Sequence, residues 1–199
     1  HSRDVLGVAW APDSRKLASV SIDNTVRVWD VLATNAAAQL LASLEGHTNY
    51  VKGVSWDPVG RYLASHGDDR AVVIWSTREY AEVARVEEPF QKSSCKTLFR
   101  RPCWSPDGQY LVCTHAVKKP SHIAVVLKRP AEGSEWREEC DFVGHSSPVA
   151  CSRFNPRFFR KHAPPAAADA DDTAAGPAAA ARPPYSVVGL GGQDCTVSV

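Results

Sequence analysis

Methionine is missing from all 199 positions of the chain. A natural chain starts with methionine, so we expect this sequence to be part of a longer protein. An excess of charge is missing too, because 23 basic and 22 acidic side chains leave a formal net charge of +1. This balance argues against a basic nucleic-acid-binding arm and against an acidic tail. No run approaches the ~20 consecutive apolar residues that a membrane-spanning helix needs.

Metal-binding and disulfide signatures are also missing. None of the six cysteines forms a C-x-x-C pair, and no Cys or His pair has the short spacing typical of zinc ligands. Three of them, Cys113, Cys151 and Cys195, lie in apolar or alternating stretches. This placement favours free core thiols in a reducing compartment, cytosol or nucleus, over a disulfide framework. We therefore expect neither a metal nor another cofactor.

What the sequence does contain is an internal repeat, visible when the chain is aligned on its tryptophans. Four aromatic residues are each followed by a proline two positions later: Trp10, Trp56, Trp104 and Phe154. Nine residues before them come the four unit starts, 46, 48 and 50 residues apart: His1, His47, Cys95 and His145. Short alternating runs rich in β-branched residues, about four per unit, are separated by turn residues. This period and strand number are typical of a β-propeller blade.

The repeat predicts an all-β chain with blades at approximately 1–46, 47–94, 95–144 and 145–199. Residues 161–184 form an Ala/Pro-rich insertion in the last blade. Such a segment cannot bury enough apolar surface to order, so we expect a disordered loop. The chain stops one residue short of the tryptophan expected in its last unit, and a propeller ring closes with ~4–8 blades. We therefore expect a partial propeller, about four blades of a larger ring.

The motifs Glu-Gly-His at 45–47, Val-Gly-His at 143–145 and Val-Trp-Asp at 28–30 resemble WD repeats. In that family a blade is held by a hydrogen-bonded tetrad of His, Ser or Thr, Asp and Trp. The resemblance implies these members here: His1, Ser19, Asp23 and Trp29 in the first blade, His47, Ser65, Asp69 and Trp75 in the second, and His145 with Asp194 in the fourth. Leu190 stands where the fourth blade would have Ser. In the third blade Cys95 and Val117 replace His and Asp, so no tetrad is expected there.

Recurring Ser, His and Asp residues also invite a hydrolase interpretation. A catalytic triad, however, occurs once per active site and beside an oxyanion hole. Here the set recurs with Trp in register with the repeat, and the nucleophile elbow, P-loop and H-E-x-x-H motifs are absent. A buried carboxylate needs such hydrogen-bonding partners, so we predict structural tetrads and no enzyme. The remaining histidines are predicted to lie in loops or at rims: His66, His115, His122 and His162.

Two small basic clusters are candidates for contact with an acidic partner or nucleic-acid phosphate. One is Arg100-Arg101, expected in the first strand of the third blade. The other surrounds Phe158-Phe159 and contains Arg153, Arg157, Arg160, Lys161 and His162. A solvated turn is the alternative interpretation, and the near-zero net charge favours it.

The segment 51–65, VKGVSWDPVGRYLAS, resembles the HIRA/Hir family of histone chaperones and the middle subunit of chromatin assembly factor one. Residues 88–90, 104–111 and the divergent third blade are similar to the same group, and 141–145 followed by 153–156 favours HIRA. The resemblance implies a nuclear, non-enzymatic scaffold, part of a seven-bladed ring, in a complex that assembles nucleosomes outside replication and regulates transcription. It implies protein partners, namely ubinuclein-like subunits and histones bound directly or indirectly, with chromatin association indirect and neither a membrane nor a small-molecule substrate.

A second hypothesis comes from another class of protein. WD repeats by themselves indicate only an interaction module. The chain is alternatively a substrate adaptor of a ubiquitin ligase or a cytoplasmic signalling scaffold. An F-box-like helix or a ligase-docking motif in flanking sequence would favour that alternative.

Overall fold

The computed structural model describes residues 1–33, 37–94, 97–131, 135–158, 185–194 and 196–198. In this part of the chain the regular structure is fifteen strands and one short 3-10 helix, Glu88–Phe90. Every strand pairing within the sheets is antiparallel. The prediction of an all-β chain is confirmed. No helix among these residues is long and apolar enough to cross a membrane.

The strands form four sheets, each built from strands consecutive in the chain. The first contains β1 Val5–Trp10, β2 Lys16–Ser21, β3 Thr25–Asp30 and β4 Gln39–Glu45. The second contains β5 Val51–Trp56, β6 Tyr62–Gly67, β7 Val72–Ser76 and β8 Glu82–Val86. The third contains β9 Cys103–Trp104, β10 Tyr110–Lys118, β11 Ser121–Lys128 and β12 Arg137–His145. The fourth contains β13 Val149–Phe154, β14 Val188–Gly192 and β15 Val197–Ser198.

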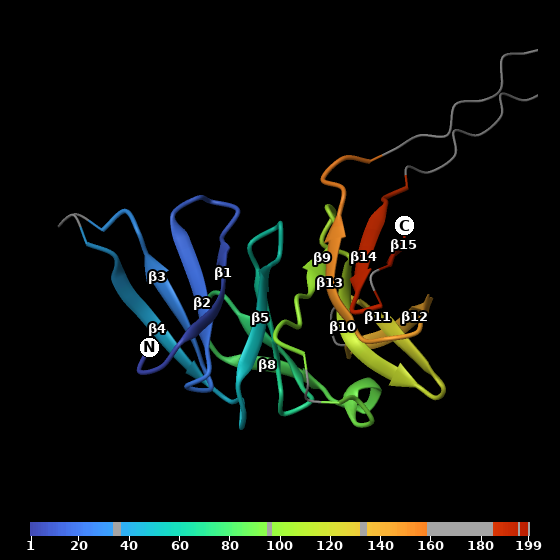
Figure 1. Cartoon of the computed structure of the whole chain (residues 1–199). Helices are drawn as coiled ribbons and strands as arrows, with labels where there is room; N and C mark the ends of the chain where they lie inside the picture. Colours follow the sequence, from blue (N-terminus) through green and yellow to red (C-terminus); the bar gives the residue numbers. More distant parts are fainter. Residues whose placement is uncertain (34–36, 95–96, 132–134, 159–184, 195, 199) are drawn as a thin grey trace, which may run out of the picture.

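The four sheets follow one another along an arc, with their first strands brought together (Figure 1). β1 lies against β5, and β9 lies against both β5 and β13. A parallel bridge between Arg101 and Cys151 extends the last of these contacts. Four-stranded antiparallel sheets whose first strands lie side by side around a common centre are the blades of a β-propeller. The predicted partial propeller of about four blades is therefore what the structure shows.

The turn after the first strand of each of the first three blades shows how the repeat sets the backbone. The fourth residue after the repeated tryptophan is Ser14, Gly60 or Gly108, with φ of 56°, 77° and 68°. Glycine adopts this left-handed region without a steric penalty. The backbone amides of Gly60 and Gly108 donate to the carbonyls of Asp57 and Ser105, which closes the turns. The same local geometry thus recurs at one position of the repeat.

The hydrophobic core lies between the blades rather than within one of them. One cluster packs Val20 and Val28 of the first blade against Val51 and Trp56 of the second. Further clusters join the second blade to the third and the third to the fourth. Because each blade buries its faces against its neighbours, stability is shared along the arc.

The predicted disordered insertion, residues 161–184, lies outside the described residues, and so do Cys95 and Cys195. The four cysteines described, Cys103, Cys113, Cys140 and Cys151, are free thiols. Burial raises the pKa of the Cys113 thiol far above its usual value. A buried thiol of this kind is an unreactive part of the core.

Candidate functional site

The second blade brings together the four side chains His47, Ser65, Asp69 and Trp75. The Nδ1 atom of His47 lies 2.8 Å from Oδ2 of Asp69, and its Nε2 atom lies 2.7 Å from Oγ of Ser65. The Trp75 indole donates to the same Oγ over 2.8 Å. The side chains come from the loop before β5, from β6, from the turn after β6 and from β7, so the cluster ties the blade's three inner strands together.

The donors and acceptors of this cluster form one consistent chain. The carboxylate of Asp69 can only accept, so Nδ1 of His47 carries the proton and Nε2 accepts the hydroxyl proton of Ser65. The hydroxyl oxygen in turn accepts the indole N–H of Trp75. Burial opposes ionisation of Asp69, but hydrogen bonds from His47 and from the backbone amides of Thr48 and Ala71 outweigh it and lower the pKa of this carboxyl group.

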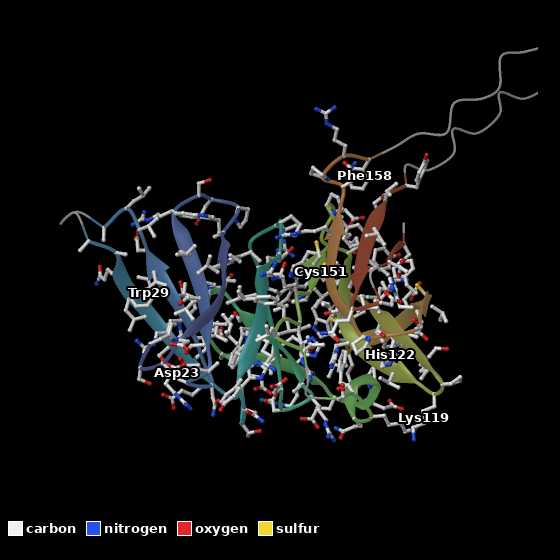
Figure 2. All side chains as sticks on the ribbon, in the orientation of Figure 1. Asp23, Trp29, Lys119, His122, Cys151 and Phe158 are labelled. Atoms are coloured by element: carbon white, nitrogen blue, oxygen red, sulfur yellow. The ribbon has the colours of Figure 1, made fainter. Side chains whose placement is uncertain are left out.

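The first blade repeats the arrangement with His1, Ser19, Asp23 and Trp29, the last two of which Figure 2 labels. Nε2 of His1 lies 2.7 Å from Oγ of Ser19, Nδ1 lies 3.1 Å from the Asp23 carboxylate, and the Trp29 indole donates to Ser19 over 2.8 Å. Thr25, which the tetrad motif does not include, adds a hydrogen bond of 2.7 Å to Asp23. Burial opposes ionisation of Asp23, but this bond and others lower its pKa to about 2.

The fourth blade builds a variant of the same cluster. Nδ1 of His145 lies 3.1 Å from Oδ1 of Asp194, and Nε2 lies 3.0 Å from Oγ of Ser198. Ser198 is the cross-strand partner of Leu190, so the neighbouring strand supplies the hydroxyl that position 190 lacks. The hydrogen bond from Thr196 is the main cause that lowers the pKa of Asp194. The alternation of Thr196 and Ser198 on one strand face was the available sequence signal.

At the junction of the second and third blades lies a group of buried charges. Oδ2 of Asp68 lies 2.5 Å from Nζ of Lys52, and Oδ1 lies 3.1 Å from Nη2 of Arg100. Lys52 also donates to the carbonyl of Thr97 over 2.6 Å, and Arg100 to that of Ser94 over 3.2 Å. The Arg100 side chain is 0% exposed. Its predicted role as a partner contact is therefore corrected, and it precedes β9 rather than lying within that strand.

Two of the histidines predicted at loops or rims are instead buried in strands. His66 lies in β6 with its ring 4.7 Å from that of Phe90, and His115 lies in β10. Burial lowers the pKa of His66 well below its usual value and that of His115 to about 4. Both are therefore neutral at physiological pH. His122 is partly buried in β11, and His162 lies outside the described residues.

The remaining residues of the predicted basic clusters are at the surface. Arg101 and Arg157 are exposed, and the Arg101 guanidinium lies 4.2 Å from the centre of the Phe99 ring. Arg160 and Lys161 are outside the part of the chain that the structure describes. Arg153 is exposed on β13.

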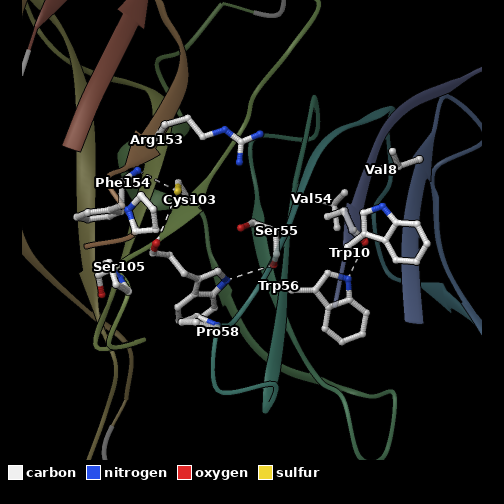
Figure 3. Close-up of a pocket in the computed structure, with 14 residues that line it drawn as sticks. Val8, Trp10, Val54, Ser55, Trp56, Pro58, Cys103, Ser105, Arg153 and Phe154 are labelled. Atoms are coloured by element: carbon white, nitrogen blue, oxygen red, sulfur yellow. Dashed lines mark hydrogen bonds between the residues drawn. The ribbon is translucent and has the colours of Figure 1, made fainter. Parts of the chain in front are cut away.

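The repeated aromatics line a cavity where the first strands of the blades meet (Figure 3). The Trp56 indole donates to the Ala9 carbonyl over 2.9 Å, and the Trp104 indole to the Ser55 carbonyl over 3.2 Å. Each of these bonds crosses from one blade to the preceding blade. Within the described ranges no group of three or more His, Cys, Asp or Glu residues could hold a metal ion.

Comparison with known proteins places these features in context. The family model of the WD domain, G-beta repeat, matches residues 1–30 and 38–76. The Protein HIRA of Oryza sativa is 43% identical across 100% of this chain and 20% of the relative, and that of Homo sapiens is 41% identical across 100% and 18%. Protein HIR1 of Cryptococcus neoformans is 38% identical across 80% and 17%. The chain thus spans about a fifth of the length of these curated relatives.

A solved structure shares the fold. A chain in the crystal structure of the Mitotic Checkpoint Complex superimposes with a TM-score of 0.61 and 26% identity, covering 78% of this chain and 44% of that one. The likeness to HIRA and HIR1 proteins is closer in sequence and extends over the blade without a tetrad. The chain is a WD-repeat β-propeller that belongs to the HIRA/Hir family.

Proposed function

We propose that the chain is a non-enzymatic scaffold part of a histone chaperone complex that assembles nucleosomes independently of replication and regulates transcription. The similarity to HIRA proteins along the whole chain, divergent third blade included, carries this proposal. The proposed location is the nucleus. The proposed partners are ubinuclein-like subunits of the complex and histones, bound directly or indirectly.

The geometry of the Ser–His–Asp sets supports a role without catalysis. In the second blade Ser65 is 0% exposed, and its hydroxyl is engaged by both His47 and Trp75. A nucleophile must be accessible to its substrate, and the Ser65 hydroxyl is buried inside its blade. We propose that the three clusters are structural tetrads, each holding one blade, in units that follow the boundaries 1–46, 47–94 and 145–199, with the tetrad-free blade at 95–144.

Affinity purification of the full-length parent protein from nuclear extract tests the proposed function. The expected result is recovery of histones or of histone chaperone subunits, detected by mass spectrometry. An Asp69→Ala variant, which opens the second tetrad, should recover less of them than a Glu79→Ala variant, which changes an exposed carboxylate. Recovery of ubiquitin-ligase subunits without histones or chaperone subunits would support the adaptor alternative and overturn the proposal.

A further inference from the structure

A continuous hollow runs along the inner side of the blades. It joins the aromatic cavity of Figure 3 to a second cavity whose wall includes Gly7, Gly53 and Arg101. Val8, Val54 and Arg153 line both cavities, so the two are contiguous. Figure 3 shows Arg153 reaching from β13 over this space.

The charged groups on the described wall of the hollow are all cationic. They are Lys52, Arg101 and Arg153, and no described carboxylate lines either cavity. Lys52 is compensated by Asp68 at 2.5 Å. Arg101 and Arg153 are exposed, and no described carboxylate lies within ion-pair distance of either. Two uncompensated guanidinium groups in a concave wall create a local positive potential on a chain of near-zero net charge.

Arg101 and Arg153 occupy positions of the repeat that are uncharged in the other blades, and the remaining cation of the wall, Lys52, is paired with Asp68. Arg153 directly precedes the repeated aromatic, where the other blades have Ala9, Ser55 and Cys103. Arg101 lies three positions before the aromatic, where the first two blades have glycine. Small residues keep the hollow open on one side, and the third and fourth blades place arginines on the other.

The backbone holds the two arginines in a defined arrangement. The amide of Arg101 donates to the Ala150 carbonyl over 3.1 Å, and the Ser152 hydroxyl donates to the Arg101 carbonyl over 3.1 Å. These bonds fix the segment before β9 against β13. Both guanidinium groups therefore project from one rigid junction, the arrangement that favours recognition of paired carboxylates.

We propose that this hollow binds an extended acidic segment of a protein partner. Carboxylates of the segment pair with Arg101 and Arg153, and its apolar side chains pack on Val8, Val54 and the exposed ring of Trp10. A peptide that alternates acidic and apolar residues uses both the cationic and the apolar parts of the wall. A basic segment such as a histone tail is repelled by the same charges, so the site serves a subunit rather than histone. The proposal does not depend on nucleosome assembly.

Fluorescence anisotropy with the full-length protein tests this site. The probe is a fluorescein-labelled peptide of alternating Glu and Leu residues, with a Gln-for-Glu peptide and a Lys-for-Glu peptide as comparisons. The acidic peptide should bind, more weakly as salt is raised, and the other two should not. The double variant Arg101→Glu/Arg153→Glu should weaken binding by about tenfold or more.

A matched control separates the site from overall charge. Arg61→Glu/Arg78→Glu makes the same change of net charge at exposed positions outside the hollow, and should change the affinity by less than about threefold. The milder Arg101→Gln/Arg153→Gln variant, checked for unchanged unfolding temperature, should also lose binding. Equal losses in the Glu variant and its control, or equal binding of the acidic and Lys-containing peptides, would overturn the proposal.

Discussion

Asp68 and Arg100 belong to different blades and form an ion pair, Oδ1 to Nη2 at 3.1 Å, in which both side chains are buried. Lys52 adds a second buried cation on the other carboxylate oxygen. The pair lies where the second blade meets the third, the blade for which no tetrad was expected. A buried ion-pair network of Asp68, Lys52 and Arg100 thus joins the two blades at this position, in addition to their apolar contact.

Asp68→Ala should strongly destabilise the protein, because it leaves Lys52 and Arg100 without their buried carboxylate partner. Removal of one member of a buried ion pair costs ~3–5 kcal/mol of unfolding free energy. Urea denaturation of the full-length protein measures this loss. Glu79→Ala, at an exposed site, should change stability by less than ~0.5 kcal/mol. Similar values for both variants would contradict the assigned role of Asp68.

Ser65→Ala should lower the free energy of unfolding by ~1–3 kcal/mol, because His47 and Trp75 both lose a buried hydrogen-bond partner. Thermal denaturation followed by circular dichroism gives the loss. Hydrolysis of a chromogenic ester should be the same for both proteins. A variant that keeps its stability but loses an esterase activity present in the unmodified protein would favour the catalytic interpretation instead.

Ser198→Ala makes the corresponding change in the fourth blade and should cost at most ~1 kcal/mol, since water can replace an exposed hydroxyl. In the described residues the Ser198 hydroxyl bonds to His145, whereas the buried Ser65 hydroxyl is engaged by both His47 and Trp75. The same denaturation measurement ranks the two serines. If Ser198→Ala lowered the free energy of unfolding by more than Ser65→Ala, the ranking of the two serines by their burial would be wrong.

Stability should fall as the pH drops below about 6.5, because His66 and His115 are buried in the neutral form. A histidine whose folded pKa is lowered binds its proton more readily in the unfolded chain. Its contribution is therefore complete above the unfolded pKa and is lost as the pH falls towards the folded value, about 4 for His115. Each group adds a slope of up to ~1.4 kcal/mol per pH unit.

His66→Leu tests this assignment. The variant should show a flatter decline of unfolding free energy between neutral and mildly acidic pH, measured by urea denaturation at a series of pH values. An unchanged slope would mean that other groups cause the acid sensitivity.

Gly53→Ala should destabilise the contact between the second and third blades. A Cβ atom at this position would lie 1.8 Å from the carbonyl oxygen of Arg100, so the backbones must move apart. Overpacking of this kind costs ~1–3 kcal/mol or more. Gly189→Ala is the matched control in a strand, because the nearest atom to its Cβ is 4.0 Å away. Equal unfolding temperatures for the two variants would contradict this account.

The strands and turns of each blade could be predicted from the sequence because the residues that define them lie close together in the chain. Asp23 follows Trp10 by 13 residues, and Trp29 follows Asp23 by six, so neighbouring strands of one blade bring them together. Turn residues and alternating runs placed the strands for the same reason. Ser198 was missed because the tetrad expectation pointed to position 190, and the hydroxyl comes from the strand opposite.

The sequence could not predict which of the basic side chains are buried. Lys52 and Arg100 occupy the same position of the repeat, four residues before the aromatic, and Arg101 is the next residue in the chain. Nothing local distinguishes the buried Arg100 from the exposed Arg101. The distinction depends on Asp68, which lies on the neighbouring blade.

The sequence alone determined the repeating unit, the all-β class and the residues of the first two His–Ser–Asp–Trp clusters, since each blade is encoded by residues close together in the chain. The tertiary structure alone decided which cations are buried, which face the inner hollow, and how the fourth blade completes its cluster. The buried cations and the hollow arise from contacts between blades whose equivalent positions lie about fifty residues apart in the chain, and no local pattern records such contacts. The fourth cluster depends on a hydroxyl from β15, and the sequence marks that position only by the alternation of Thr196 and Ser198.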